Sequence, residues 1–320
     1  MKLKNFTKSI AVFAMVLIAT LCMGAGSTKV KAADVGYISS VQQTGADKHA
    51  VTVTWTPVSD ATSYNVYYAD YSKGYDAEYV LAGSTADTSY TITGLDDGSK
   101  YDVKVAPVNA TGEGYGKSCY DDVITLPDSL SYLKQTKWWY FIHQLDVEWE
   151  KQNAVDGYEV VLYDNNGKKV SKQILTGSYS YYTTFKNMKD KVYTVQARSY
   201  KVWNGTKYYS SWSKIYCLNQ ARITSAKVSG NKLNIKWGKV AGATSYEVYV
   251  STKPKSGYKK VATVSKNKSS YTVKKVKGKK ISSKKTYYVY VKTVCKKGKT
   301  KNTSGALYYW NTKSNGFGYL

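Results

Sequence analysis

Histidine, cysteine, proline and arginine are all scarce in this chain of 320 residues, and their scarcity argues against several classes of protein. The chain holds only two histidines, His49 and His143, and neither lies near an acid and a nucleophile at the spacing of a known catalytic motif. No cluster of cysteine and histidine has the spacing of a metal site. We therefore expect no enzyme, no catalytic residue, no cofactor and no metal.

The few cysteines also limit the covalent framework. Beyond the N-terminal segment there are three, Cys119, Cys217 and Cys295, one in each third of the remaining chain. Because none has a partner in its own third, at most one bridge between thirds could form, and we expect buried free thiols instead.

The N-terminal segment has the features of a secretory signal peptide. Lys2, Lys4 and Lys8 precede an apolar run over residues 10–23, and a cleavage site with small residues follows before Ala33. We predict a signal peptide over residues 1–32, of the long type found in Gram-positive bacteria. The alternative of an uncleaved anchor is weaker because the apolar run is short for a membrane span. We expect a secreted, extracellular protein with no membrane span after signal removal.

A repeated aromatic spacing then predicts the architecture. A tryptophan is followed nine residues later by a tyrosine that opens an alternating strand, at Trp55 and Tyr64, Trp149 and Tyr158, and Trp237 and Tyr246. The interval between repeats is about the length of one small all-β domain. We predict an all-β chain of three tandem domains, over residues 33–126, 127–219 and 220–315.

The residues around these pairs resemble the fibronectin type III family. In the first domain the resemblance rests on Trp55, on Tyr64 and Val66, and on the segment from Gly94 to Tyr101, which reads Gly-Leu-Asp-Asp-Gly-Ser-Lys-Tyr. It implies an immunoglobulin-like β-sandwich, with Tyr101 as the tyrosine corner between the fifth and sixth strands, E and F. The third domain has a longer E to F segment, and the second lacks the Gly-x-x-Tyr turn.

The resemblance implies no catalysis. The two pairs of adjacent aspartates are therefore interpreted as parts of the fold and not as catalytic carboxylates. Asp96 and Asp97 fall in the polar E to F turn of the first domain. Asp121 and Asp122 lie beside the last strand, where alternation directs one of them away from any shared site. The junctions between domains are short and lack Gly/Ser-rich spacers, which predicts a semi-rigid rod.

Charge differs strongly between the three domains. The first has a net charge of −8 and the second of +5, whereas the third has 24 Lys and Arg against the single acid Glu247. A domain of this kind favours anionic partners. Export argues against nucleic acid as the physiological ligand and favours an anionic cell-wall polymer. The candidate binding residues are Lys274, Lys275, Lys277, Lys279, Lys280, Lys284, Lys285, Lys296, Lys297 and Lys299.

Aromatic residues provide a second candidate site. If Tyr287 and Val289 point into the core, Tyr288 and Tyr290 point outward, together with Tyr249 on the neighbouring strand. We predict an aromatic platform of Tyr249, Tyr288 and Tyr290, with Trp203 at a loop tip of the second domain as a further contact. The alternatives are that the tyrosines stabilise the sheet and that tryptophans such as Trp138 and Trp139 pack between domains.

The sequence thus predicts a non-enzymatic surface-binding or spacer protein. Its third domain is expected to dock on an anionic wall polymer. The main alternative is a carbohydrate-binding or protein-adhesive protein that uses exposed Tyr and Trp, with a glycan or another surface protein as partner. Head-to-tail self-association, in which the acidic first domain meets the basic third domain of another copy, is a third alternative.

Overall fold

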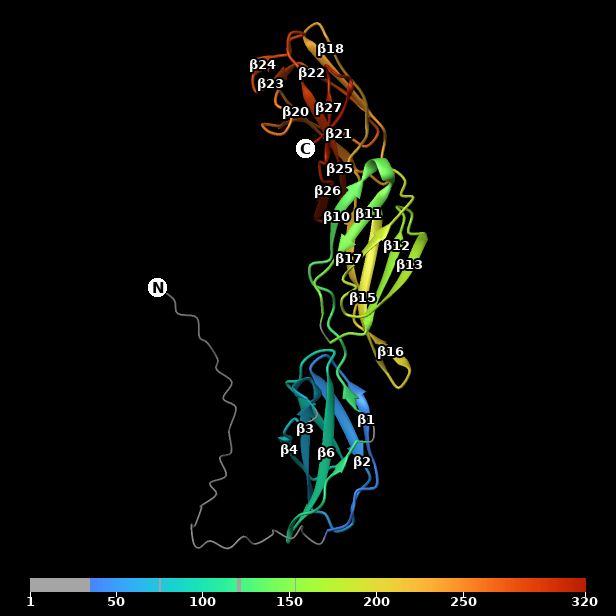
Figure 1. Cartoon of the computed structure of the whole chain (residues 1–320), viewed down its shortest axis with the longest axis vertical. Helices are drawn as coiled ribbons and strands as arrows, with labels where there is room; N and C mark the ends of the chain where they lie inside the picture. The colour runs from blue at the N-terminus through green and yellow to red at the C-terminus, as the bar shows by residue number, and fades with distance from the viewer. Residues whose placement is uncertain (1–34, 75, 120–121, 153) are drawn as a thin grey trace, which may run out of the picture.

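The computed structural model describes residues 35–74, 76–119, 122–152 and 154–320. Three β-sandwiches follow one another along the long axis of the molecule, from the first sandwich, which contains β1 and β2, to the third, which contains β18 and β22 (Figure 1). The predicted signal peptide, residues 1–32, lies outside the described residues.

The first sandwich consists of a three-stranded sheet packed on a larger one. The smaller sheet has the order β1-β2-β5, and the larger has the order β4-β3-β6-β7 with β8 and β9 also paired to β6. A short 3-10 helix, η1 (Tyr71–Lys73), follows β3. The strands are β1 (Val41–Ala46), β2 (Ala50–Trp55), β3 (Ser63–Asp70), β4 (Val80–Thr85), β5 (Ser89–Thr93), β6 (Lys100–Asn109), β7 (Gly112–Glu113), β8 (Lys117–Ser118) and β9 (Val123–Ile124).

The second sandwich repeats this arrangement. Its smaller sheet has the order β10-β11-β14 and its larger sheet the order β13-β12-β15-β16, with β17 also paired to β15. The 3-10 helix η2 (Tyr140–Ile142) connects β10 to β11. The strands are β10 (Lys134–Trp139), β11 (Gln144–Glu148), β12 (Gly157–Tyr163), β13 (Lys169–Thr176), β14 (Tyr182–Phe185), β15 (Tyr193–Trp203), β16 (Thr206–Tyr209) and β17 (Ser213–Cys217).

The third sandwich has the same two sheets and one addition. The orders are β18-β19-β22 and β21-β20-β25-β27-β28, with β26 paired to β25, and a separate hairpin β23-β24 lies between the fifth and sixth main strands. The last strand extends the sheet beyond residue 315, where the third domain was predicted to end. The strands are β18 (Ile223–Ser229), β19 (Lys232–Trp237), β20 (Ser245–Ser251), β21 (Lys259–Ser265), β22 (Ser270–Val273), β23 (Lys275–Val276), β24 (Lys279–Lys280), β25 (Tyr288–Lys297), β26 (Thr300–Thr303), β27 (Tyr308–Asn311) and β28 (Gly316–Tyr319).

The repeated tryptophan and tyrosine meet in each core. The ring centroids of Trp55 and Tyr64 lie 5.3 Å apart in an edge-to-face arrangement, and the pairs in the second and third sandwiches lie 5.2 and 5.7 Å apart. In this geometry the positive ring edge of one residue faces the negative ring face of the other. The nine-residue spacing is therefore the distance along the chain between two strands that face each other across the core.

A tyrosine corner closes each sandwich. The hydroxyl of Tyr101 accepts a hydrogen bond from the backbone N–H of Asp96 at 2.7 Å, which confirms the predicted corner. Tyr193 accepts the same kind of bond from Lys189 at 3.1 Å. The second sandwich thus forms a corner without the Gly-x-x-Tyr turn, because the bond needs only a hydroxyl at the start of the sixth strand and a free N–H a few residues upstream.

Cys217 and Cys295 are buried free thiols, as predicted. Cys119 is only half-buried. Each sandwich is therefore stabilised by its apolar core and its corner hydrogen bonds.

Candidate functional site

The first two sandwiches are joined by the tip of a hairpin. The hairpin β15-β16 extends from the second sandwich toward the first (Figure 1), and the indole N–H of Trp203 donates a hydrogen bond to the backbone carbonyl of Asp122 at 2.5 Å. Trp203 therefore stabilises a junction between sandwiches. Trp203, which precedes the turn of this hairpin, thus has a structural contact in addition to its predicted role in an aromatic ligand platform.

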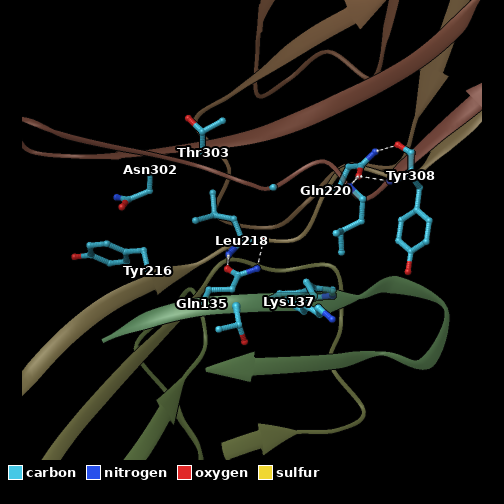
Figure 2. A pocket seen from close by; sticks show the side chains of 12 residues that line it. Gln135, Lys137, Tyr216, Leu218, Gln220, Asn302, Thr303 and Tyr308 are labelled. Atoms are coloured by element: carbon cyan, nitrogen blue, oxygen red, sulfur yellow. Dashed lines mark hydrogen bonds between the residues drawn. The ribbon is translucent and has the colours of Figure 1, made fainter. Parts of the chain in front are cut away.

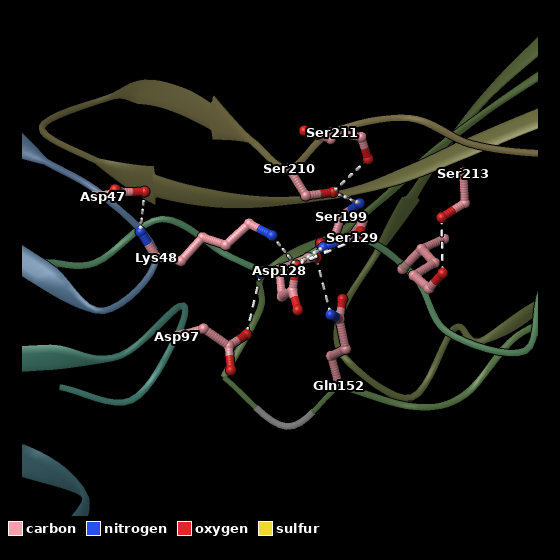
Figure 3. Close-up of polar contacts among 11 residues, drawn as sticks. Asp47, Lys48, Asp97, Asp128, Ser129, Gln152, Ser199, Ser210, Ser211 and Ser213 are labelled. Carbon is pink, nitrogen blue, oxygen red and sulfur yellow. Dashed lines mark hydrogen bonds and ion pairs between the residues drawn. The ribbon is translucent and has the colours of Figure 1, made fainter. Parts of the chain in front are cut away.

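Polar contacts around Asp128 fix the same junction (Figure 3). The backbone N–H of Asp128 donates to a carboxylate oxygen of Asp97 at 3.0 Å, and its side chain accepts a hydrogen bond from Lys48. Its backbone carbonyl accepts hydrogen bonds from Ser199 and Gln152 at 3.1 and 2.9 Å. Asp97 therefore acts as a structural carboxylate at the E to F end of the first sandwich.

The second and third sandwiches are joined by backbone hydrogen bonds. The N–H of Val192 donates to the carbonyl of Ala241 at 2.7 Å, and the N–H of Ala241 donates to the carbonyl of Asp190 at 2.9 Å. The side chain of Val192 is buried in the core of the third sandwich. Asn219 donates to the Asp190 carboxylate at 2.6 Å, and burial raises the pKa of that carboxyl. The predicted semi-rigid rod is consistent with these contacts.

A cavity of about 210 Å³ lies at this second junction (Figure 2). Two glutamines bind backbone groups at its wall: Gln135 exchanges two hydrogen bonds with Leu218, and the amide of Gln220 donates to the carbonyl of Tyr308 at 2.6 Å. Trp138 also lines the cavity and packs against Tyr193 in the core of the second sandwich, with ring centroids 5.8 Å apart. Trp138 therefore packs mainly within the core of the second sandwich, whereas the alternative interpretation placed it between domains.

The E to F end of each sandwich points toward the next one. In the first sandwich this end contacts the linker, where the N–H of Gly98 donates to the carbonyl of Leu126 at 3.0 Å. In the second it contacts Ala241. The equivalent end of the third sandwich carries the hairpin β23-β24 and has no further sandwich against it within the described part of the chain (Figure 1). We call this surface the free end.

All ten predicted lysines are exposed, but they form two separate groups. Seven lie in the E to F connection at the free end: Lys274, Lys275, Lys277, Lys279, Lys280, Lys284 and Lys285. Lys296 and Lys297 are the last residues of β25, and Lys299 lies in the turn that follows, at the end of the sheet near the second sandwich (Figure 1). The strand residues 288–295 separate the two groups, which corresponds to roughly 25 to 30 Å.

Two hollows at the free end are lined by lysines from separate segments of the chain. The larger, of about 530 Å³, is lined by Lys284 and Lys285, and also by Lys227 from β18 and Lys313 from the turn between β27 and β28. The smaller, of about 170 Å³, includes Lys277, Lys279, Lys280 and Lys285 in its lining. The sequence analysis missed Lys227 and Lys313, because only the folded sheets bring them beside the E to F connection.

The single acid of the third sandwich is already neutralised. Glu247 is 4% exposed, and its carboxylate accepts hydrogen bonds from Lys301 at 2.7 Å, Tyr249 at 2.8 Å and Lys260 at 3.3 Å. Burial raises the pKa of Glu247, but the hydrogen bonds from Lys301, Tyr249 and Lys260 outweigh it and lower the pKa to about 2. No carboxylate side chain of this sandwich is therefore left to compensate the lysines at the free end.

The predicted tyrosine platform is not an open surface. Tyr249, Tyr288 and Tyr290 do lie on the sheet face away from the core, but Tyr290 is only 8% exposed. Tyr249 stacks on it with ring centroids 4.8 Å apart, and Tyr258 covers it at 4.6 Å. Burial and the Glu247 carboxylate raise the pKa of Tyr249 to about 12. The tyrosines pack against one another on the sheet, so the prediction of a flat, exposed platform is wrong for Tyr290.

The two histidines have structural contacts. The Nδ1 atom of His49 lies 2.9 Å from the carbonyl of Leu95, and that of His143 lies 3.1 Å from the carbonyl of Met188. Within the described residues no group of three or more His, Cys, Asp or Glu could hold a metal ion. In the same part of the chain, no helix has the length and apolar character needed to cross a membrane. Asp121, one of the paired carboxylates, lies outside the described residues.

Comparison with known proteins defines the class of fold. Residues 37–119 match the fibronectin type III domain family, so the first sandwich is a fibronectin type III domain. The chain is all-β, and its second and third sandwiches repeat the two-sheet arrangement of the first. Domains of this family are generally structural or binding modules without catalytic activity.

Three proteins illustrate the similarity. The chain is 41% identical over 68 residues to the tail tube protein gp17.1* of Bacillus phage SPP1, a match that spans 21% of this chain and 23% of the phage protein. A two-domain fibronectin type III segment of chicken tenascin has 16% identity and a TM-score of 0.39, covering 57% of this chain and 99% of the segment. The chicken CNTN1 FN1–FN3 domains have 13% identity and a TM-score of 0.30, covering 87% of this chain and 98% of theirs.

Proposed function

We propose that this protein is exported by a Gram-positive bacterium and docks on an anionic polymer of the cell wall through the free end of its third sandwich. The observation that carries the proposal is the position of the lysines. Seven exposed lysines of the E to F connection lie at the end where the two preceding sandwiches each contact a neighbour, and Lys227 and Lys313 join them.

The chemistry of the free end favours a repeating anion over one small ligand. Lysine is a hydrated point charge and does not fix the geometry of an anion as a guanidinium fork does. Several weak contacts to successive phosphates or carboxylates add up when the partner is a polymer. Binding of this type weakens with salt, because exposed charges are screened within about 8 Å at physiological ionic strength.

The acids of the first sandwich are divided between its two ends. Asp97 and Asp122 lie at the junction with the second sandwich, whereas Asp60 and Asp87 lie at the opposite, outer end. Of these four, only Asp60 and Asp87 could face the third sandwich of a second copy, so we favour a foreign anion over head-to-tail contact. The second and third sandwiches would then act as the rigid stem that projects the acidic first sandwich away from the wall.

The proposal is tested by co-sedimentation of the full chain with Gram-positive wall sacculi, with and without their teichoic acids, over a series of salt concentrations. We expect binding that decreases steeply with salt and disappears when the teichoic acids are removed. Binding that survives both changes would contradict electrostatic docking. Absence of binding at low salt would contradict docking and would favour a spacer or a protein with another partner.

A further inference from the structure

We propose that the second sandwich carries a binding site for an uncharged polysaccharide, formed by four exposed tyrosines. The tyrosine cluster consists of Tyr132, Tyr179, Tyr181 and Tyr182 together with Lys151. It is distinct from the lysines of the third sandwich and from the predicted platform. The function proposed above assigns it no role.

Backbone hydrogen bonds bring three segments of the chain together at this site. The N–H of Trp149 donates to the carbonyl of Tyr181 at 3.0 Å, and the N–H of Glu150 donates to the carbonyl of Ser131 at 3.1 Å. Residues 131–132, 149–151 and 179–182 are therefore neighbours. The ammonium group of Lys151 lies 3.6 Å from the ring centroid of Tyr179, which links two of the segments through a cation–π contact.

The four rings are far more exposed than the tyrosines of the third sandwich. Tyr132 is 76% exposed, Tyr179 75%, Tyr182 63% and Tyr181 40%, in contrast to 8% for Tyr290. None of the four hydroxyls makes a hydrogen bond to another described residue. The hydroxyl groups, and the ring faces that Lys151 does not cover, are thus available to a ligand.

The backbone of Tyr132 provides an independent indication of function. Its φ angle is +53°, in the left-handed region that bulky residues seldom adopt. Its side chain gains little packing in return, because most of it faces solvent. Strained conformations without a packing benefit occur preferentially at functional sites.

The surroundings favour an uncharged ligand with alternating apolar and polar groups. Lys134 pairs with Glu148 at 2.9 Å, and the charge of Glu150, which accepts a hydrogen bond from Ser131, is opposed by that of the adjacent Lys151, so these residues carry no net charge together. The three segments contain no Val, Leu or Ile that would form the apolar centre of a protein interface. A sugar ring offers an apolar C–H face to an aromatic ring and hydroxyls to the phenol oxygens, which matches separate tyrosines set among polar groups.

The test is calorimetric titration of the full chain with two neutral probes, the hexasaccharides of β-1,4-linked glucose and of β-1,4-linked N-acetylglucosamine. We expect saturable binding to at least one probe that changes little with salt. Y179A and Y182A should each weaken it by about tenfold, the effect of removing one aromatic hot spot. Tyr37→Ala is the matched control, because Tyr37 is 77% exposed on the first sandwich and should leave binding unchanged.

Two results would overturn this inference. One is the absence of saturable binding to both probes at millimolar concentration. The other is equal binding by wild type and by Y179A and Y182A. The two sites can be tested separately, because binding at the tyrosine cluster should change little with salt, whereas binding of the lysines to sacculi should be salt-sensitive. Failure of sugar binding would therefore leave the binding to sacculi intact.

Discussion

The backbone N–H of Ser282 donates a hydrogen bond to the hydroxyl of Tyr287 at 3.0 Å. This tyrosine corner fixes the C-terminal end of the E to F connection, the segment between β22 and β25 that carries the lysines of the free end. The bond spans five residues, as it does between Asp96 and Tyr101 in the first sandwich, although the third sandwich has a longer E to F segment. The extra residues form the hairpin β23-β24 and leave the corner itself unchanged.

Tyr287→Phe should loosen the sixth strand of the third sandwich. Removing the hydroxyl leaves the N–H of Ser282 without its acceptor, at a cost of about 1 kcal/mol. Amide hydrogen exchange in β25 should therefore accelerate about fivefold. Tyr288→Phe is the control, since the ring of Tyr288 packs on Tyr309 and its hydroxyl bonds no described residue. Equal exchange in the two variants would contradict the assigned role of the corner.

Glu247 should make the stability of the third sandwich depend on pH in the acid range. The folded-state pKa of Glu247, about 2, lies below its ordinary value of 4.5, so the unfolded chain binds the proton more readily. The stabilisation is therefore fully present above about pH 4.5 and is lost as the pH falls toward about 2.

Glu247→Gln should lower the stability of the third sandwich by about 1 to 3 kcal/mol at neutral pH, because Lys301 and Lys260 lose their counter-charge. Thermal unfolding of wild type and variant at several pH values measures this difference. The two proteins should converge as the pH approaches 2. A difference that stays constant down to that pH would show that Glu247 does not act through its charge.

Trp203→Ala should loosen the junction between the first and second sandwiches, because it removes both the hydrogen bond to Asp122 and the ring at the hairpin tip. Small-angle X-ray scattering should then show a broader distribution of shapes. Trp139→Ala is the control: its indole donates to Asp146 within the second sandwich at 2.7 Å, so the shape of the rod should not change. An unchanged scattering profile for Trp203→Ala would mean that the contacts of Asp128 alone fix the junction.

The sequence predicted what depends on local pattern. Alternation and the spacing from Trp55 to Tyr64 are local properties, and they identified the strands, the cores and the first tyrosine corner. The direction of Tyr290 was also predicted correctly, since it follows from alternation along β25. Its burial was not, because Tyr258 covers it from a loop more than thirty residues earlier in the chain.

The candidate sites show the same division between local and long-range information. The excess of lysine over acid can be counted in the sequence, but its division between two ends of the third sandwich follows from the course of β25. The tyrosine cluster was missed because its members come from three segments that only the fold brings together. A run such as Tyr179-Ser-Tyr-Tyr182 in a polar loop was the one local signal that could have indicated it.

The central claim is that the free end of the third sandwich, and not its overall charge, binds the anionic polymer. Two triple variants of the full chain carry the same net charge: Lys280, Lys284 and Lys285 to Gln at the free end, and Lys296, Lys297 and Lys299 to Gln at the opposite end. Their co-sedimentation with teichoic-acid-containing sacculi should be compared at low and at physiological salt. We predict about tenfold weaker binding and a shallower salt dependence for the free-end variant, with little change for the other. Equal weakening of both variants would contradict the claim and would assign binding to net charge alone.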